Sequence, residues 1–297
     1  MNEIKFGGIS RSCVLWKDDI KKLKELGFLH VELRVDNVDN DSLIYNEKFQ
    51  NEICQLLKRF NMTVTIHAFE DVMFGESIKK INDVIMQILV AQVKLAYNLG
   101  AKQIVFHLGK YPNKNHGCNK KQRIENAKKL LKDLIGNTED IPVKILIENL
   151  KYCDENKGCS FLGDDIDEIF DVKNSVKSDK IGVVLDIGHM MLHKKTYDQI
   201  LNKAELCINE VDEIHLHFNN FEKDQHLGVT EEFVCNNIDL IRCIRNILNK
   251  ASLCVLEMDL IEAKNTKDFF KNMNKEYSFH RKGVKNEQEV IDTANYL

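Results

Sequence analysis

The stretch "IGVVLDIGH", residues 181–189, is apolar throughout except for Asp186 and His189 near its end. A short, nearly continuous apolar run of this kind predicts a strand that is buried on both faces. Burying a carboxylate or an imidazole without a partner costs several kcal/mol. The two polar residues therefore indicate that the end of this strand binds something.

Seven other short, β-rich runs recur along the chain, and most are nearly continuous rather than alternating, as in parallel strands covered on both faces. Amphipathic segments of helical period lie between the runs, and two of them end at Gly27 and Gly100, residues that favour helix termination. The runs are "IKFGGIS" at 4, "HVELRV" at 30, "VTIHA" at 64, "QIVFHLG" at 103, "VKILIENL" at 143, "EIHLHFN" at 213 and "LCVLEMD" at 253.

With residues 181–189, these runs make eight strand-plus-helix units that fill nearly the whole chain. This spacing predicts a (β/α)8 TIM barrel. We expect a single domain over residues 1–297, with the barrel at about 4–260 and a C-terminal helical appendage at about 261–297. The alternative is a doubly wound α/β fold in which a few elements are misassigned.

The composition, 43% hydrophobic and 30% charged, is that of an ordinary globular protein. A net charge of −4 gives no general attraction to nucleic acid, although a local basic rim remains compatible with it. No segment has the ~20 apolar residues that cross a bilayer. The nine cysteines form no C-x-x-C pair, and "MNEIKFGGIS" lacks the apolar core of a signal peptide. We therefore expect a cytoplasmic protein without membrane contact, and a homo-oligomer is possible.

Side chains that can bind metals stand where the predicted strands end, which is the face where barrel enzymes build their active sites. One such histidine would be expected to be a hydrogen-bonded core residue. Convergence from six successive strands is not explained by packing alone. The residues are His67, His107, Glu148, Asp186, His189, His215, His217 and Glu257, joined by Asp224 and His226 of the loop "KDQHLG".

Imidazole and carboxylate ligands together suit zinc, manganese, cobalt or iron, whereas magnesium and calcium favour oxygen ligands. A histidine-rich shell without paired cysteines is typical of an open, catalytic site. We therefore expect Asp186 and His189 to be delivered to a metal or to a substrate bound to it.

Six segments carry a family resemblance in their order along the chain: "HAFE", "FHLG", "IEN", "LDIGH", "HLHFNN...DQHLG" and "LEMD". Over roughly residues 4–260 the chain resembles the xylose isomerase-like barrel superfamily. That group contains sugar and sugar-phosphate isomerases and epimerases, together with apurinic endonucleases of the endonuclease IV type.

The resemblance implies a divalent transition metal, Mn²⁺ or Zn²⁺, with one ion expected and up to three possible. The ligands of the central ion would be Glu148, Asp186, His215 and Glu257. The endonuclease branch adds two further ions, which matching positions here would hold through His67, His107 and Glu148, and through His189, Asp224 and His226. In the isomerase branch the residue that matches His189 contacts substrate.

His215 and His217 share one face of their strand because side chains alternate with a period of two. Their roles could therefore be exchanged. We favour His215 as the ligand and His217 as a residue behind the ligands or in contact with substrate.

The first functional hypothesis is a metal-dependent isomerase or epimerase of a small sugar or sugar phosphate, which works through an enediolate. The resemblance implies that Glu148 and Glu257 exchange the proton. Glu32 matches a strand-two glutamate of the sugar-acting branch, and a buried salt bridge with Arg34 is its alternative role. Arg34 and Lys110 could bind a substrate phosphate, although the loop at 109–121 also fits a solvated surface loop.

The second hypothesis is an endonuclease IV-type phosphodiester hydrolase with a trinuclear metal site. All nine ligand-type positions favour it. "HAFED" lacks the tyrosine of the endonuclease "HAPY", "DQH" replaces "DRH", and "HLHFNN" replaces "HLND". The chain also lacks an arginine-rich loop after its second strand and a basic segment interleaved with aromatic residues. We therefore favour the sugar isomerase and do not expect nucleic acid as a partner, while leaving it open.

Overall fold

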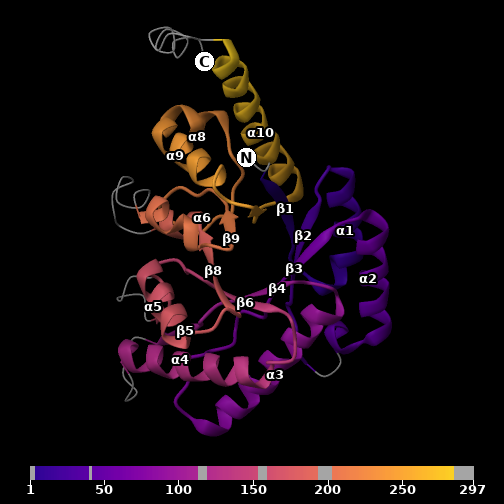
Figure 1. The fold of residues 1–297 in the computed structure, drawn as a ribbon, viewed down its shortest axis with the longest axis vertical. Helices are drawn as coiled ribbons and strands as arrows, with labels where there is room; N and C mark the ends of the chain where they lie inside the picture. Colours follow the sequence, from indigo (N-terminus) through magenta and orange to yellow (C-terminus); the bar gives the residue numbers. More distant parts are fainter. Residues whose placement is uncertain (1–3, 40–41, 113–118, 153–158, 193–202, 284–297) are drawn as a thin grey trace.

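A computed structural model describes residues 4–39, 42–112, 119–152, 159–192 and 203–283 of the chain. Eight parallel strands close into a barrel in the order β1-β10-β9-β8-β6-β4-β3-β2, and helices surround it (Figure 1). The strands are β1 Lys5–Ser10, β2 His30–Arg34, β3 Thr63–His67, β4 Gln103–Phe106, β6 Lys144–Glu148, β8 Ile181–Asp186, β9 Glu213–Leu216 and β10 Leu253–Leu256. The predicted (β/α)8 barrel is confirmed, and the doubly wound alternative is wrong because the first and last strands pair with each other.

The helices follow the strands in turn, as βα units require. Asn46 caps the first turn of α2 by accepting a hydrogen bond from the Phe49 N–H, and Gly27 and Gly100 adopt positive φ values just beyond α1 and α3. The helices are α1 Trp16–Glu25, α2 Glu47–Phe60, α3 Lys79–Asn98, α4 Lys120–Asn137, α5 Ile166–Val176, α6 Ile187–Met191, α8 Glu231–Asn236, α9 Ile238–Leu248 and α10 Leu260–Gly283, with the short 3-10 turns η1 Cys13–Leu15, η2 Leu43–Tyr45 and η4 Ile208–Glu210.

Helix α10 contains the first part of the expected C-terminal appendage. Its Ala263 and Phe270 are buried, and the helix packs against β1 and β10. The beginning of this segment is thus the helix that covers the seam of the barrel. Residues 284–297 of the expected appendage lie outside the described residues.

The main apolar core lies between the strands and the helices, and a separate small cluster consists of Val105, Leu146 and Val184. These three residues stand two positions before His107, Glu148 and Asp186 on their strands, so they share an inward face with them. Hydrocarbon therefore lies directly below these three polar residues.

A second, two-stranded antiparallel sheet joins β5 (Lys110–Pro112) to β7 (Cys159–Phe161). The two strands come from the segments that follow β4 and β6. The start of the segment at 109–121 is thus a strand whose Lys110 side chain is exposed, and residues 113–118 lie outside the described part. Within the described ranges, no helix has the length and apolar character needed to traverse a membrane.

Candidate metal centre

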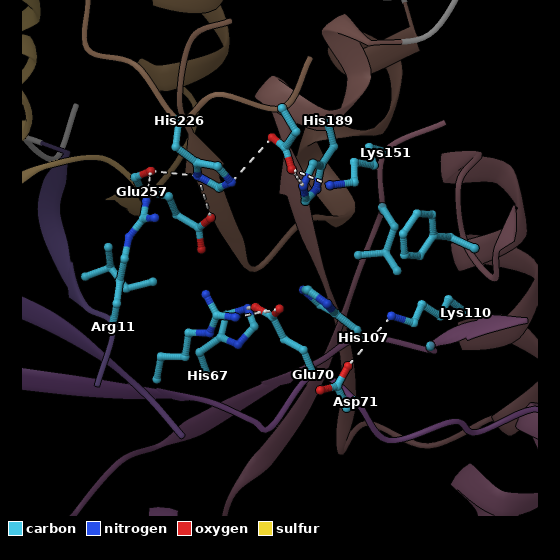
Figure 2. A pocket seen from close by; sticks show the side chains of 16 residues that line it. Arg11, His67, Glu70, Asp71, His107, Lys110, Lys151, His189, His226 and Glu257 are labelled. Carbon is cyan, nitrogen blue, oxygen red and sulfur yellow. Dashed lines mark hydrogen bonds and ion pairs between the residues drawn. The ribbon is translucent and has the colours of Figure 1, made fainter. Parts of the chain in front are cut away.

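A cavity of about 240 Å³ opens at the carboxyl ends of the barrel strands (Figure 2). Its walls and floor include six of the expected ligand-type residues, namely His67, His107, His189, Asp224, His226 and Glu257. Such a space suits a small ligand.

The central group of donors lies below this floor. Single ligand atoms of Glu148, Asp186 and His215 all lie within 4.8 Å of one another, and the three residues are fully buried. His215 Nδ1 lies 3.4 Å from Glu148 Oε2 and 3.1 Å from Glu257 Oε1. Strand register explains part of this arrangement, because Asp186 and His215 are direct partners across β8 and β9. Glu148 and Glu257 therefore both face one imidazole nitrogen of His215, and Asp186 lies close to Glu148 and His215.

Glu148 also joins the central group to a neighbouring one. Its Oε2 lies 3.1 Å from His107 Nε2 and 3.4 Å from His67 Nε2. The two imidazole rings meet edge to face, with their centroids 4.8 Å apart. The structure thus brings His67, His107 and Glu148 together as the sequence predicts.

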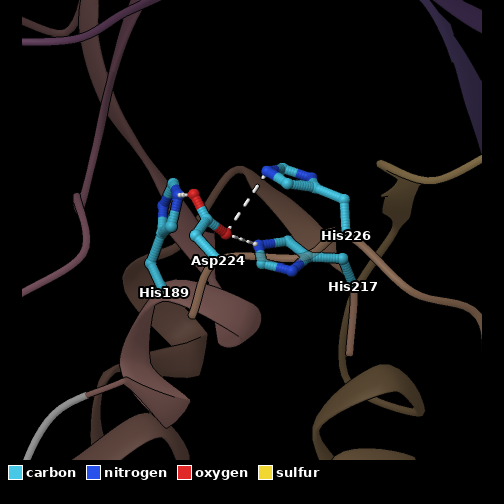
Figure 3. Close-up of side chains that lie close together, drawn as sticks. All are labelled: His189, His217, Asp224 and His226. Atoms are coloured by element: carbon cyan, nitrogen blue, oxygen red, sulfur yellow. Dashed lines mark ion pairs between the residues drawn. The ribbon is translucent and has the colours of Figure 1, made fainter. Parts of the chain in front are cut away.

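A further group surrounds Asp224, which lies between His189 on one side and His217 and His226 on the other (Figure 3). Asp224 Oδ2 lies 3.6 Å from His189 Nε2, and Asp224 Oδ1 lies 3.3 Å from His226 Nε2. His217 Nε2 is 3.6 Å from the same Oδ1, and its ring stacks on His226 at 3.9 Å. His217 therefore belongs to this group.

Asn149 holds the end of β8 in place. Its side chain donates to the Asp186 carbonyl and accepts from the Asp186 N–H, at 2.9 and 2.8 Å. Asp186 Oδ1 in turn accepts from the His189 N–H at 2.7 Å, which caps α6. This role of Asn149, the last residue of "IEN", was not predicted from the sequence. The available signal was an amide directly after a predicted ligand at a strand end.

The site stabilises opposite charges on its carboxylates and imidazoles. Burial alone would raise the pKa of Glu148, but the neighbouring histidines, led by His215 and His107, hold that pKa well below its usual range. Burial opposes protonation of His67, yet the carboxylates of Glu148 and Glu32 raise its pKa to about 10. Glu148 is therefore ionised at neutral pH, whereas burial raises the pKa of Glu32 to about 7.

Several buried nitrogen and oxygen atoms that could bind a metal have no hydrogen-bond partner among the described residues. Atoms of complementary charge nevertheless lie close to them. The atoms without such a partner include Glu148 Oε1, Asp186 Oδ2, His215 Nδ1, Glu257 Oε1 and both ring nitrogens of His217. Polar atoms left in this state are costly. Nitrogen and oxygen atoms that lie close together without hydrogen-bond geometry could instead bind one cation between them. A set of imidazole nitrogens and carboxylate oxygens suits zinc or manganese.

Four cationic side chains line the cavity, and two of them were predicted. Arg34 pairs with Glu70, with 2.7 Å between Nη2 and Oε2. Lys110 Nζ lies 4.0 Å from an Asp71 carboxylate oxygen. Both predicted residues therefore face the cavity, each beside an acidic neighbour.

The sequence reasoning missed the other two cations, Arg11 and Lys151. Arg11 Nη2 donates to the Glu257 carbonyl at 2.8 Å, and Lys151 Nζ lies 2.9 Å from Asp224 Oδ2. In Figure 2, Arg11 stands beside Glu257, while Lys110 and Lys151 stand on the opposite wall. Both residues closely follow the end of a strand, Arg11 after β1 and Lys151 after β6, and this position was the signal available.

Two expected substrate contacts differ in the structure. Glu32 and His217 are fully buried, and neither lines the cavity. The alternative salt bridge between Glu32 and Arg34 is also wrong, because Arg34 pairs with Glu70 whereas Glu32 Oε2 lies 3.3 Å from His215 Nε2. Side-chain alternation along a strand predicted that these residues face the inside of the barrel. It could not predict how far below the cavity they lie.

Comparisons with known proteins agree with this architecture. The model of the xylose isomerase-like TIM barrel family matches residues 20–272. A search of the curated proteins gives no match to this chain.

Solved structures share the fold at low sequence identity. A D-tagatose 3-epimerase-like protein superposes with a TM-score of 0.74 at 19% identity, covering 93% of this chain and 100% of that one. D-psicose 3-epimerase from Clostridium cellulolyticum H10, with D-tagatose, gives 0.70 at 15% identity, covering 91% and 99%. A Thermus thermophilus protein soaked with ZnCl₂ gives 0.65 at 14% identity, covering 92% and 99%.

Proposed function

Because the chain belongs to the xylose isomerase-like TIM barrel family, we propose that it is a metal-dependent isomerase or epimerase of a small sugar or sugar phosphate. The observation that carries the proposal is the grouping of Glu148, Asp186 and His215 beneath a small cavity, with Glu257 of the cavity lining in contact with the same histidine. The epimerase names of two structural neighbours support the choice of reaction.

Glu148, Asp186, His215 and Glu257 would hold the ion, with Mn²⁺ or Zn²⁺ as the best fit to their donor atoms. When bound, a divalent ion supplies Lewis-acid polarisation of carbonyl and hydroxyl oxygens. One ion is our expectation. The histidine-rich groups around Glu148 and Asp224 provide donors for up to two more.

Glu257 and Glu148 would carry the proton transfers. Glu257 lines the cavity, and its pKa is lowered because the imidazolium of His215 outweighs the effect of burial. An ionised carboxylate can remove the proton next to a substrate carbonyl and leave an enediolate, while a second glutamate that has taken up a proton from solvent gives it, as the carboxylic acid, to the other face. Glu148 contacts the same His215 Nδ1 as Glu257, at 3.4 Å, and is our candidate for that second role.

The remaining cavity residues would bind and orient the sugar. His189 lies in the cavity wall, where its Nε2 can bind a hydroxyl group while Nδ1 is hydrogen-bonded to the Asn149 carbonyl. Arg34 and Lys110 also line the cavity. They would contact the far end of the substrate, including a phosphate where the substrate carries one.

The test is a panel of ketoses and aldoses, free and phosphorylated, incubated in ²H₂O with the Mn²⁺- or Zn²⁺-loaded protein. We expect epimer formation with one deuterium incorporated at the inverted carbon. Glu257→Gln should lower the rate by about 10²–10⁴-fold, the usual contribution of a general acid or base. Glu210→Gln, which changes an exposed carboxylate, is the matched control. The absence of turnover and exchange with every substrate would contradict the proposal.

The alternative function is an endonuclease IV-type hydrolase of abasic sites. It is favoured by one observation, the formation of two histidine-rich groups beside the central one. Duplex DNA with an abasic site, incubated with the protein and Mn²⁺ or Zn²⁺, distinguishes the two functions. We expect no cleavage, and efficient nicking would make the hydrolase the better assignment.

A further inference from the structure

Glu32 is a fully buried carboxylate, and within the described residues neither of its oxygens has a hydrogen-bond partner. It stands two positions before Arg34 on β2, and Arg34 is the register partner of His67. Two residues along a strand correspond to about 6.6 Å. Glu32 therefore lies one inward-facing layer deeper than Arg34 and does not line the cavity, although one of its oxygens lies within 4.8 Å of ligand atoms of His67 and Glu257.

The nearest complementary atom to Glu32 is a ring nitrogen of His215. Glu32 Oε2 lies 3.3 Å from His215 Nε2, while His215 Nδ1 faces Glu257 and Glu148 at 3.1 and 3.4 Å. The ring thus spans two layers, with Nε2 toward the interior of the barrel and Nδ1 toward the donor group. A neutral imidazole carries one N–H, so its tautomer decides which nitrogen is free to bind a cation.

We propose that Glu32 is a positioning residue that accepts the Nε2–H of His215 and thereby leaves Nδ1 bare toward the metal of the proposed function, on which this inference rests. Histidines that bind metals commonly donate their second N–H to a carboxylate, which fixes the ring and raises its basicity. The carboxylate needs no other partner to do so. This role accounts for a buried carboxylate that has no hydrogen-bond partner among the described residues.

Glu213 is the other carboxylate near this nitrogen, and its contacts differ. Its Oε1 lies 3.7 Å from His215 Nε2, and its Oε2 accepts hydrogen bonds from Gln103 and Thr65. Glu213 is buried like Glu32 but is already held by neutral donors. Glu213→Gln therefore removes a buried carboxylate close to the same ring without removing the acceptor of the Nε2–H.

The experiment measures Co²⁺ affinity by chelator competition in wild type, Glu32→Met, Glu32→Gln and Glu213→Gln, each checked for folding by circular dichroism. Met has a similar length and no strong acceptor, whereas Gln keeps one acceptor oxygen. Loss of such a carboxylate typically weakens metal binding about 10–100-fold. We expect that loss in Glu32→Met, an intermediate loss in Glu32→Gln, and a Kd within about threefold of wild type in Glu213→Gln.

A second readout is the His215 tautomer in the metal-free protein, from ¹⁵N-histidine NMR assigned with His215→Asn. Burial opposes protonation of His215, but the nearby carboxylates raise its pKa well above the usual value, so the spectra are recorded at a pH alkaline enough to leave the ring neutral. We expect the Nε2–H form in wild type and Glu213→Gln, and loss of that preference in Glu32→Met. If Glu32→Met does not fold, Glu32→Gln is the deciding variant. In Glu32→Gln the His215 Nε2–H resonance should shift and the Kd for Co²⁺ should rise.

An unchanged Kd together with an unchanged tautomer in the Glu32 variants would overturn the assignment. A change in the number of Co²⁺ ligands, seen as altered visible bands in the Glu32 variants only, would also overturn it by making Glu32 a ligand. Wild type that binds no Co²⁺ would refute the metal-dependent function instead, and the tautomer comparison would still decide the role of Glu32.

Discussion

Glu148 is the residue on which the centre depends most. Its carboxylate oxygens lie 3.1–3.4 Å from nitrogens of four histidines, namely His67, His107, His189 and His215. One carboxylate thus neutralises and orients imidazoles from four different segments of the chain. Replacing it should affect every donor group around the cavity floor.

The first prediction follows from these contacts. The purified wild-type protein should contain a divalent transition metal, and the double variant Glu148→Gln with Asp186→Asn should lose it, because two anionic ligands become neutral amides. Elemental analysis of both proteins measures the ratio of metal to chain. Wild-type protein without metal, or a double variant that keeps it, would contradict the prediction.

The second prediction concerns a histidine that lies outside the donor groups. His30 is buried on β2, its Nδ1 lies 2.8 Å from Thr63 Oγ1, and burial lowers its pKa to about 4. The folded state therefore binds this proton less readily than the unfolded state, whose histidine pKa is ~6.5. The resulting stability is fully present above pH 6.5 and is lost as pH falls toward 4.

His30→Gln should remove this pH dependence. Relative to the variant, wild type should lose about 2–3 kcal/mol of unfolding free energy between pH 7.5 and pH 4.5. Denaturant unfolding of both proteins at the two pH values, with chelator present throughout, measures the difference. A gap between wild type and variant that does not change with pH would refute the prediction.

At the scale of the element, strand alternation explains both what the sequence reveals and what it hides. The apolar runs gave all eight barrel strands, and the position after each run gave the ligand-type residues, because in a parallel barrel every strand ends at the same face. Alternation says which face a side chain takes but not how deep it lies. For this reason Glu32 was expected in the cavity although it lies beneath His215.

The small sheet of β5 and β7 was not predicted for a different reason. Its strands, Lys110–Pro112 and Cys159–Phe161, have three residues each and pair only with each other. Three residues are too few to show a period. The roles of Arg11 and Lys151 depend on side-chain reach across the mouth, which no local pattern encodes.

The third prediction concerns α6, whose backbone approaches β9 closely. A Cβ at Gly188 would overlap the ring of His217, and Asn219 donates to the Gly188 carbonyl at 2.9 Å. Gly188→Ala should therefore displace His217 and lower the unfolding free energy by about 1–3 kcal/mol, as overpacking does.

Gly136→Ala in α4 is the matched control, because a Cβ there meets no atom within 4 Å. We expect it to be neutral or stabilising by up to about 1 kcal/mol, since alanine is the better helix former. Thermal and denaturant unfolding of the two variants measure the contrast. Equal stabilities would show that the contact between Gly188 and His217 is loose.

At the scale of the whole molecule, we expect binding of a metal ion to be coupled to closure of the barrel. Glu148, Asp186, His215 and Glu257 lie at or next to the ends of four strands, and β10, which precedes Glu257, pairs with β1 at the seam. A cation held by these residues links segments that separate when the barrel opens. Binding to the folded state alone should therefore stabilise the entire fold.

The fourth prediction gives the expected increase in unfolding free energy on metal binding. A free metal concentration 100 times the Kd should add about 2.7 kcal/mol to the unfolding free energy. For a chain of this length the melting temperature should rise by about 4 °C. Calorimetry with Zn²⁺ or Mn²⁺, with and without chelator, measures the shift. Glu148→Gln is expected to show little of it, and an equal shift in that variant would place the ion elsewhere.

The inward placement of His215 and His217 on either side of the outward-facing Leu216 has a consequence for how this gene can change length. One codon inserted or deleted within β9 would turn both imidazoles toward the helices and put a leucine in their place. The same event in the segments that join strands to helices leaves every donor on its own side. Descendants of this sequence should therefore vary in length in the segments between their strands. The spacing from His215 to His217 should stay at two residues for as long as the metal centre is functional.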